Sequence, residues 1–428
     1  MTAIEVPGDK SISHRILMLA TLAEGPSTVQ GILRSDDVRA TVDAMRRLGA
    51  SIHEDGNETR IVGPVRWLTP EGEIDCVNSG TTARLLLGLL AGLGIRAVIR
   101  GDPSLSRRPM ERVVYPLQAM GARIRYLTGE GTLPLELSAR RSGSLRSLKH
   151  RPRVASAQVK SSILFAGLAG GTRVEVSEAQ ATRDHTERLL DAMGAPISVD
   201  RTEDGGAMVC LEPDRQRSEL SPLRMSVPGD FSSAAFLLAA GWLGAGKVEV
   251  RRVGLNPTRT GLLDVAGGMG ARFEVGEDDV QGHEPTGGVR ASPSRLRPCD
   301  VDSRSIPRLV DEIPVLAILA ARAAGVSRIR GAEELRWKES DRLAVLATNL
   351  GRLGVRCREL ADGLEIEGTD APLTGRVQCE GDHRIAMAFG ALGATPGCRI
   401  SVDDASCVSV SYPSFWHDLE RISASEAA

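Results

Sequence analysis

Polar and hydrophobic positions alternate along the chain in two kinds of segment. Six segments are apolar or small on nearly every side and begin at a polar residue, which predicts buried helices. Their polar starts are Asp9, Asn78, Ser156, Asp230, Asp311 and Asp382, and residues of these types cap helix N-termini. Between them lie amphipathic segments such as 37–48 and 186–193, which predict helices with one face toward solvent.

A short phrase, Met or Leu followed by Gly and then Ala or Val, follows the amphipathic segments. It stands at 48–50, 120–122, 193–195, 269–271 and 353–355, each time ahead of a strand-like stretch. Glycine at this place predicts a left-handed residue that ends each helix. Together, the two patterns predict six repeats of about 70 residues, each with a buried helix, an outer helix and short strands.

The phrase Val-Pro-Gly-Asp occurs twice, at 6–9 and 227–230. This restart predicts an α/β protein of two similar domains with three repeats each, one over 9–227 and one over 1–8 and 228–428. A solenoid of stacked repeats is the alternative. The polar, glycine-rich stretch 277–298 is expected to be a long surface loop.

Composition narrows the class of protein. The 428 residues carry a formal net charge of -2, so no overall basic field indicates a nucleic-acid partner. The seven cysteines are scattered without a C-x-x-C pair, which predicts neither a zinc site nor disulfides and favours the cytoplasm. We expect no signal peptide, no membrane segment and no dinucleotide cofactor, because the corresponding patterns are missing from the sequence.

Charged residues follow the first Val-Pro-Gly-Asp phrase but not the second. Lys10 and Arg15 stand where the second copy has Phe231 and Phe236. Backbone N–H groups at a helix start, together with Lys10, Ser11 and Arg15, would form an anion site. The alternative is a capped helix with solvated cations.

Arginines also stand at other predicted helix starts. Arg107 and Arg108 precede Pro109, which is expected at the first helical position, and Arg183 precedes the segment 186–193. Arg384 opens the last buried segment in the same way. Because the positive end of a helix disfavours a cation, each arginine is a candidate for binding an anion.

Other polar starts offer smaller groups and carboxylates. Gly80 leaves room for a ligand in a polar turn, and Ser156 and Gln158 offer hydroxyl and amide groups; a capped tight turn is the alternative for Gly80. Asp311 and Glu339 lie where neighbouring cations and burial shift a carboxyl pKa in opposite directions, as acid–base catalysis requires. For these two, the alternative is a capping residue and a surface charge run.

Taken together, these phrases resemble the 5-enolpyruvylshikimate-3-phosphate (EPSP) synthase family. The motifs, which span almost the whole chain, are PGDKSISHR at 7–15, NSGTTARLL at 78–86, GDPSLSRRPM at 101–110, ASAQVKSS at 155–162, TRDHTE at 182–187, DEIP at 311–314, RWKESDRL at 336–343 and DHRIAM at 382–387. The resemblance implies two domains, each of three β-α-β-α-β-β units with buried parallel helices (an inside-out α/β barrel), and ligands in the interdomain cleft. It also implies transfer of the carboxyvinyl group of phosphoenolpyruvate to the 5-hydroxyl of shikimate 3-phosphate, in the shikimate pathway to chorismate and the aromatic amino acids.

The resemblance also implies residue roles. Binding of shikimate 3-phosphate falls to Lys10, Ser11, Arg15, Ser156, Ala157, Gln158, Arg183, Asp311 and Lys338. Binding of phosphoenolpyruvate falls to Lys10, Gly80, Arg108, Gln158, Arg342 and Arg384. Asp311, Glu339 and Lys10 are the implied catalytic residues, and neither a metal nor an organic cofactor is implied. We expect a monomer, and glyphosate as a possible inhibitor at the phosphoenolpyruvate site.

Some positions depart from the family pattern. Ala157 stands where some relatives have serine, and Val410 lies where many have a lysine. The closest alternative is UDP-N-acetylglucosamine enolpyruvyltransferase, which normally has an asparagine after the first lysine; here Ser11 follows Lys10. A non-catalytic anion-binding scaffold is a second alternative, against which the retained Asp311 and Glu339 argue.

Overall fold

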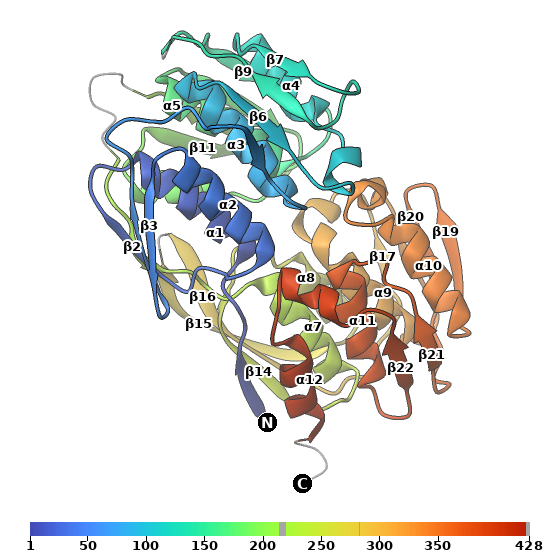
Figure 1. Ribbon diagram of the computed structural model, residues 1–428. Helices are drawn as coiled ribbons and strands as arrows, with labels where there is room; N and C mark the ends of the chain where they lie inside the picture. Colours follow the sequence, from blue (N-terminus) through green and yellow to red (C-terminus); the bar gives the residue numbers. More distant parts are fainter. Residues whose placement is uncertain (142, 214–219, 282, 425–428) are drawn as a thin grey trace. The chain divides into compact units, whose positions relative to one another are not determined.

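The computed structural model describes residues 1–141, 143–213, 220–281 and 283–424, in two compact units (Figure 1). The N-terminal unit holds Asp9–Val227 with Gln281–Glu284. The C-terminal unit holds Met1–Gly8, Pro228–Val280 and Pro285–Ala428. Each unit has its own hydrophobic core.

Three four-stranded sheets form the N-terminal unit, in the orders β13-β2-β4-β3, β5-β6-β8-β7 and β9-β10-β12-β11. Each sheet combines one parallel pair with an antiparallel hairpin. The strands are β2 (Ser27–Gln30), β3 (Ser51–Asp55), β4 (Glu58–Val62), β5 (Glu73–Asp75), β6 (Ala97–Arg100), β7 (Ile124–Tyr126), β8 (Leu135–Leu137), β9 (Leu148–His150), β10 (Val174–Glu178), β11 (Ile197–Arg201), β12 (Ala207–Leu211) and β13 (Arg224–Ser226).

Helices of this unit divide into inner and outer sets, as the sequence predicts. The inner helices are α1 (Lys10–Leu19), α3 (Gly80–Leu93) and α5 (Ala157–Gly170); the outer ones are α2 (Asp36–Arg47), α4 (Glu111–Ala119) and α6 (His185–Ala192). Glycines let α3 and α5 approach closely: a Cβ on Gly88 would lie 2.1 Å from the Ser162 carbonyl oxygen. Substitution there would push apart the helices whose starts carry the polar residues.

The C-terminal unit repeats this plan, with sheets β1-β14-β16-β15, β17-β18-β20-β19 and β21-β22. Its strands are β1 (Thr2–Glu5), β14 (Val248–Gly254), β15 (Arg272–Gln281), β16 (Glu284–Ser292), β17 (Asp300–Val301), β18 (Val326–Ile329), β19 (Arg356–Leu360), β20 (Gly363–Glu367), β21 (Thr374–Val377) and β22 (Arg399–Val402). The inner helices are α7 (Phe231–Trp242), α9 (Ile313–Ala321) and α11 (His383–Gly393), and the outer ones are α8 (Gly261–Gly268), α10 (Arg342–Arg352) and α12 (Phe415–Ala424). Within the described residues, the sixth repeat is shorter than the others, because α12 takes the place of a final hairpin.

In each unit, the first sheet is completed by a strand from a distant part of the chain. β1 runs parallel to β14, with Thr2 opposite Val248, and β13 runs parallel to β2, with Arg224 opposite Thr28. The chain therefore passes between the units at the two Val-Pro-Gly-Asp phrases. Their glycines, Gly8 and Gly229, form an isolated β-bridge in the C-terminal unit.

The predicted helix-ending glycines are confirmed. All have positive φ: Gly49 +101°, Gly121 +98°, Gly194 +79°, Gly270 +88° and Gly354 +85°. The pattern of apolar phrases thus located the ends of five outer helices correctly.

Three predicted helix starts are wrong in detail. Ser79, rather than Asn78, caps α3 with its hydroxyl. Asp311 lies in a short 3₁₀ turn, and α9 begins at Ile313 without a side-chain cap. Pro109 precedes α4, which begins at Glu111.

The expected surface loop at 277–298 is also wrong, because its first part forms the paired strands β15 and β16. Val289 and Ala291 are buried at alternate positions, as in a half-buried strand. The glycines serve close packing instead of a loop, since a Cβ on Gly287 would lie 1.9 Å from the Gly276 carbonyl oxygen. Among the described residues, no helix is long and apolar enough to cross a membrane.

Candidate active site

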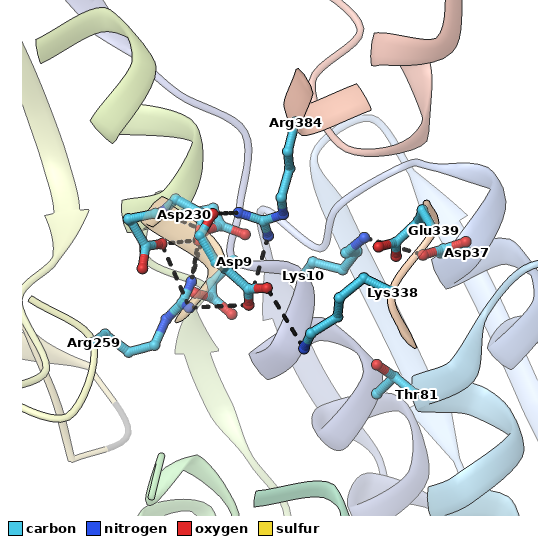
Figure 2. Close-up of polar contacts among 12 residues, drawn as sticks. Asp9, Lys10, Asp37, Thr81, Asp230, Arg259, Lys338, Glu339 and Arg384 are labelled. Carbon is cyan, nitrogen blue, oxygen red and sulfur yellow. Dashed lines mark hydrogen bonds and ion pairs between the residues drawn. The ribbon is translucent and has the colours of Figure 1, made fainter. Parts of the chain in front are cut away.

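Lys10 is the first residue of α1 in the N-terminal unit. Its Nζ lies 3.1 Å from Asp37 Oδ2, and Figure 2 shows the two side chains facing each other. Asp9 caps the same helix by accepting the Ile12 N–H at 2.9 Å. A cation is thereby held at a helix start, where backbone N–H groups also favour an anion.

Arg15 is buried one turn further along α1 and connects three helices. Its Nε donates to Thr186 Oγ1 at 2.7 Å, Nη1 to the Ser11 carbonyl at 2.9 Å and Nη2 to Ser161 Oγ at 2.9 Å. Burial lowers the pKa of Arg15 to about 10, and the nearby Arg183 acts in the same direction. The structure therefore brings Ser11, Arg15 and Arg183 near one another, and their role in binding stays a prediction.

The starts of α3 and α5 are joined through the Gln158 amide. Its Nε2 donates to Thr81 Oγ1 at 2.9 Å, and its Oε1 accepts from Arg84 Nη1 at 2.8 Å. Gly80 opens α3, and a Cβ there would lie 2.6 Å from Arg84 Nη1 and 3.5 Å from Arg108 Nη1. Gly80, Arg108 and Gln158 thus form one group with Arg84.

Ser156 and Ala157 precede Gln158 at the start of α5. Ser156 caps α5, its hydroxyl accepting the Val159 N–H, and Ala157 is the first helical residue. Arg84 lies in the motif at 78–86, but the resemblance implies no role for it. Its position in the first turns of a helix was the available signal, by the same dipole argument that singled out Arg108. Arg107, in contrast, is exposed in a short 3₁₀ turn.

In the C-terminal unit, Asp311 is surrounded by cations from three other segments. Its Oδ1 lies 3.5 Å from Arg342 Nη1 and 3.9 Å from Lys338 Nζ. Its Oδ2 lies 3.9 Å from Arg384 Nη2, and its backbone carbonyl accepts from Arg384 Nη1 at 3.1 Å. These cations favour the ionised carboxylate that a proton acceptor requires.

Arg342 contacts Glu339 as well as Asp311, the two predicted catalytic carboxylates, and it also contacts Asp382. Its Nη2 lies 2.6 Å from Glu339 Oε2 and its Nε 2.8 Å from Asp382 Oδ2. Burial alone would lower the pKa of Arg342, but Asp382, Glu339 and Asp311 outweigh it and raise that pKa. The guanidinium is therefore a fixed positive charge that holds Glu339 near Asp311.

Arg259 is a buried cation that the sequence reasoning missed. Its Nη2 donates to Asp230 Oδ1 at 3.0 Å and to Ser232 Oγ at 2.9 Å, and its Nη1 lies 3.9 Å from Asp311 Oδ2. Figure 2 shows its side chain extending toward Asp230. The signal was present, because Arg259 stands just ahead of α8, as Arg183 stands ahead of α6.

Each unit therefore presents a distinct chemistry. The N-terminal unit gathers cations, amide and hydroxyl groups at three inner helix starts, an arrangement suited to phosphate and carboxylate groups. The C-terminal unit places two carboxylates among cations, an arrangement suited to proton transfer near anions. Among the described residues, no group of three or more His, Cys, Asp or Glu residues could hold a metal ion.

The model of the family described as EPSP synthase (3-phosphoshikimate 1-carboxyvinyltransferase) matches residues 2–419. The chain belongs to the EPSP synthase family. A 3-phosphoshikimate 1-carboxyvinyltransferase from Salinibacter ruber is 45% identical over 427 residues, covering 99% of this chain and 97% of the relative. One from Geobacter metallireducens is 43% identical over 424 residues, covering 98% and 96%. The resemblance inferred from the motifs is thereby confirmed.

Solved structures of EPSP synthases agree with this assignment. The EPSP synthase from Acinetobacter baumannii has a TM-score of 0.83 and 36% identity, covering 98% of this chain and 95% of that one. The enolpyruvyl transferase NikO from Streptomyces tendae, at 19% identity and a TM-score of 0.74, shares the fold. The expected fold class is confirmed.

Proposed function

We propose that the protein transfers the carboxyvinyl group of phosphoenolpyruvate to the 5-hydroxyl of shikimate 3-phosphate, releasing phosphate. The family match over residues 2–419 supports this EPSP synthase activity, in the shikimate pathway to chorismate. The structural observation that carries it is Arg342, which contacts both Asp311 and Glu339. The reaction needs proton transfer at two places beside anionic groups. Asp311 and Glu339 are two carboxylates among cations, so they can serve these two places.

Substrate binding is proposed for the residues that the motifs single out. Shikimate 3-phosphate is bound by Lys10, Ser11, Arg15, Ser156, Ala157, Gln158, Arg183, Asp311 and Lys338. Phosphoenolpyruvate is bound by Lys10, Gly80, Arg108, Gln158, Arg342 and Arg384. Support comes from the charges at the inner helix starts, since each substrate carries both a phosphate and a carboxylate. Arginine pairs with such planar or tetrahedral anions through two N–H groups at once.

Proton transfers at two places follow from these positions, the 5-hydroxyl and C3 of phosphoenolpyruvate. Asp311 accepts the proton of the 5-hydroxyl as the hydroxyl oxygen attacks C2 of phosphoenolpyruvate. Glu339 donates a proton to the methylene carbon, giving a tetrahedral ketal, and removes one from the methyl group when phosphate leaves. Lys10 assists proton transfer. Glu339 ends protonated, as it began, and the proton accepted by Asp311 leaves with the phosphate, so the atoms balance and neither step needs an oxidant or a covalent enzyme intermediate.

The finer assignments are proposals as well. The domains are 9–227 and 1–8 with 228–428, and residues of both take part in the one reaction. The compact units, whose bounds agree except for residues 281–284, support this division. We propose a monomer in the cytoplasm; the seven cysteines, all free, are compatible with a reducing compartment.

Phosphate release tests the activity. Purified protein should release phosphate only when phosphoenolpyruvate and shikimate 3-phosphate are both present, at neutral pH. Release with UDP-N-acetylglucosamine in place of shikimate 3-phosphate would instead select the sister activity. A folded protein that releases phosphate with neither acceptor would contradict the proposal.

A further inference from the structure

Arg259 lies in a group of buried charges in the C-terminal unit. It is 3% exposed, and Glu312, beside Asp311 in the chain, is fully buried. Arg259 Nη1 lies 3.9 Å from both Asp311 Oδ2 and Glu312 Oε1. One guanidinium thus faces two adjacent carboxylates that would otherwise repel each other.

The other edge of the Arg259 guanidinium is held at the start of α7. Nη2 donates to Asp230 Oδ1 and Ser232 Oγ, while Asp230 caps the helix by accepting the Ser232 N–H at 2.8 Å. The Ser232 hydroxyl in turn donates to Glu312 Oε1. These contacts fix Arg259 to the core of the unit.

Three further cations face Asp311, and the proposed function gives each of them to a substrate. They are Lys338 after the 3₁₀ turn Glu333–Trp337, Arg342 on α10 and Arg384 on α11. Lys338 also lies 3.9 Å from Glu334, and Arg342 also contacts Glu339 and Asp382. Substrate phosphate and carboxylate groups would compete with Asp311 for these three charges.

Arg259 has no such assignment and is fixed by Asp230 and Ser232. We propose that Arg259 is a positioning residue that keeps Asp311 ionised, and thus ready to accept the hydroxyl proton, after the anionic substrates have bound. Arg259 balances the charge of Glu312 and orients Asp311 without touching a substrate. The inference rests on the proposed function, because it assigns Arg259 a part in that reaction.

The pH profile of kcat tests this role. An opposite charge within about 4–6 Å lowers a carboxyl pKa by about 1–3 units. In Arg259→Gln, the acid limb of the kcat profile should therefore move to higher pH by about one unit. In Glu312→Gln, which removes the neighbouring negative charge, the acid limb should move to lower pH. KM for both substrates should change by less than about twofold in each variant.

Two variants serve as controls. Arg259→Lys keeps the charge, so its acid limb should move less than that of Arg259→Gln. Arg308→Gln removes a half-exposed arginine that donates to the carbonyl of Pro257, two residues before Arg259, and pairs with Asp264 on α8. Its kcat profile should match that of the wild type, although it too loses an ion pair.

Opposite movements of the acid limb cannot arise from loss of stability alone. The role is overturned if Arg259→Gln and Glu312→Gln both leave the acid limb unmoved, or move it in the same direction. If Arg259→Gln does not fold, as judged by urea denaturation, the other two variants test the role. The acid limb of the kcat profile should then move to lower pH in Glu312→Gln and move little in Arg259→Lys, and any other result overturns the role. An inactive wild type would contradict the proposed function, whereas an active wild type with unmoved limbs contradicts only the role of Arg259.

Discussion

The guanidinium of Arg342 binds the carboxylate of Asp382 through two of its nitrogen atoms. Nε lies 2.8 Å from Oδ2, and Nη2 donates to Oδ1 at 3.3 Å. Both side chains are almost completely buried. Asp382 also accepts the Arg384 N–H at 2.9 Å, so one carboxylate caps α11 and neutralises an arginine of α10.

Replacement of Asp382 should destabilise the protein markedly. Asp382→Asn keeps an acceptor for the helix cap but removes the charge that faces the buried Arg342. Breaking a buried pair costs about 3–5 kcal/mol, and because Glu339 still contacts Arg342 we expect a loss near the lower value, about 3 kcal/mol. Urea denaturation measures it. In the control, Glu367→Gln removes the exposed partner of Arg356 and should cost less than about 1 kcal/mol; equal losses would contradict the expectation.

Glu339→Gln should separate binding from proton transfer. The amide can still accept a hydrogen bond from Arg342 Nη2, which lies 2.6 Å from Glu339 Oε2, so the segment should keep its position. Exchange of the C3 methylene protons of phosphoenolpyruvate with deuterated water, which passes through the methyl group of the ketal, should fall by about 10²-fold or more, as expected for loss of an acid–base group. NMR follows the exchange and calorimetry the binding of both ligands. Unchanged turnover would remove Glu339 from its proposed role.

Gly80→Ala should disturb the group around Gln158. The new Cβ would lie 2.6 Å from Arg84 Nη1, so the guanidinium must move and its 2.8 Å hydrogen bond to Gln158 is lost. A shift of about 1 Å in a positioning group can cost about 10²-fold, so KM for phosphoenolpyruvate should rise clearly. Steady-state kinetics with and without glyphosate measures this, and inhibition should weaken at the same time.

A matched glycine provides the control for Gly80→Ala. Gly351 lies in α10, and a Cβ there would have no atom within 4 Å. Gly351→Ala should stabilise the helix by roughly 0.5–1 kcal/mol and leave KM unchanged. A similar rise in KM for both variants would show that the effect does not come from Arg84.

Stability should fall in mild acid because of His14. Its ring is buried against Thr41, and burial, with smaller effects of Lys10 and Arg15, lowers its pKa well below the usual value of 6.5. The folded chain keeps His14 neutral, whereas the unfolded chain takes up a proton below about pH 6.5. The stability is therefore complete above that pH and declines as the pH falls from 6.5 toward 5, by up to about 1.4 kcal/mol per pH unit.

Denaturation at a series of pH values checks this expectation. His14→Asn should show a shallower decline than the wild type, while a variant of the exposed His417, His417→Asn, should keep the wild-type slope. Burial raises the pKa of Glu187 and so acts in the opposite direction, but it does so equally in all three proteins. Equal slopes for wild type and His14→Asn would contradict the role of His14.

Local patterns predicted the repeats well and three-dimensional proximity less well. The glycines at 49, 121, 194, 270 and 354 end helices as expected, because chain geometry at a helix end depends on neighbouring residues alone. The stretch 277–298 misled the prediction, since Gly276 and Gly287 serve a close approach of two strands, which composition does not reveal.

For the site too, local patterns identified candidate residues, but not which of them lie close together. Lys10, Arg15 and Arg183 could be proposed as site residues because each stands at a predicted helix start. Arg259 was missed although it meets that criterion, because its importance comes from Asp311, which lies far away in the sequence. The tertiary structure determines which distant charges form ion pairs. Sequence patterns can therefore identify charged candidate residues, but they do not predict the partners of those residues.

The pairing of β1 with β14 determines when the protein can finish folding during synthesis. Thr2–Glu5 is synthesised before the N-terminal unit, yet its partner Val248–Arg251 is synthesised only after Asp9–Val227 has been made. Until then, Thr2–Glu5 lacks the strand with which it forms a parallel pair. The N-terminal unit has no such delay, because its last strand, β13, pairs with a β2 that is already present. The first sheet of the N-terminal unit can thus be completed before the C-terminal unit has been synthesised, whereas the first sheet of the C-terminal unit requires β14 to pair with a strand made more than two hundred residues earlier.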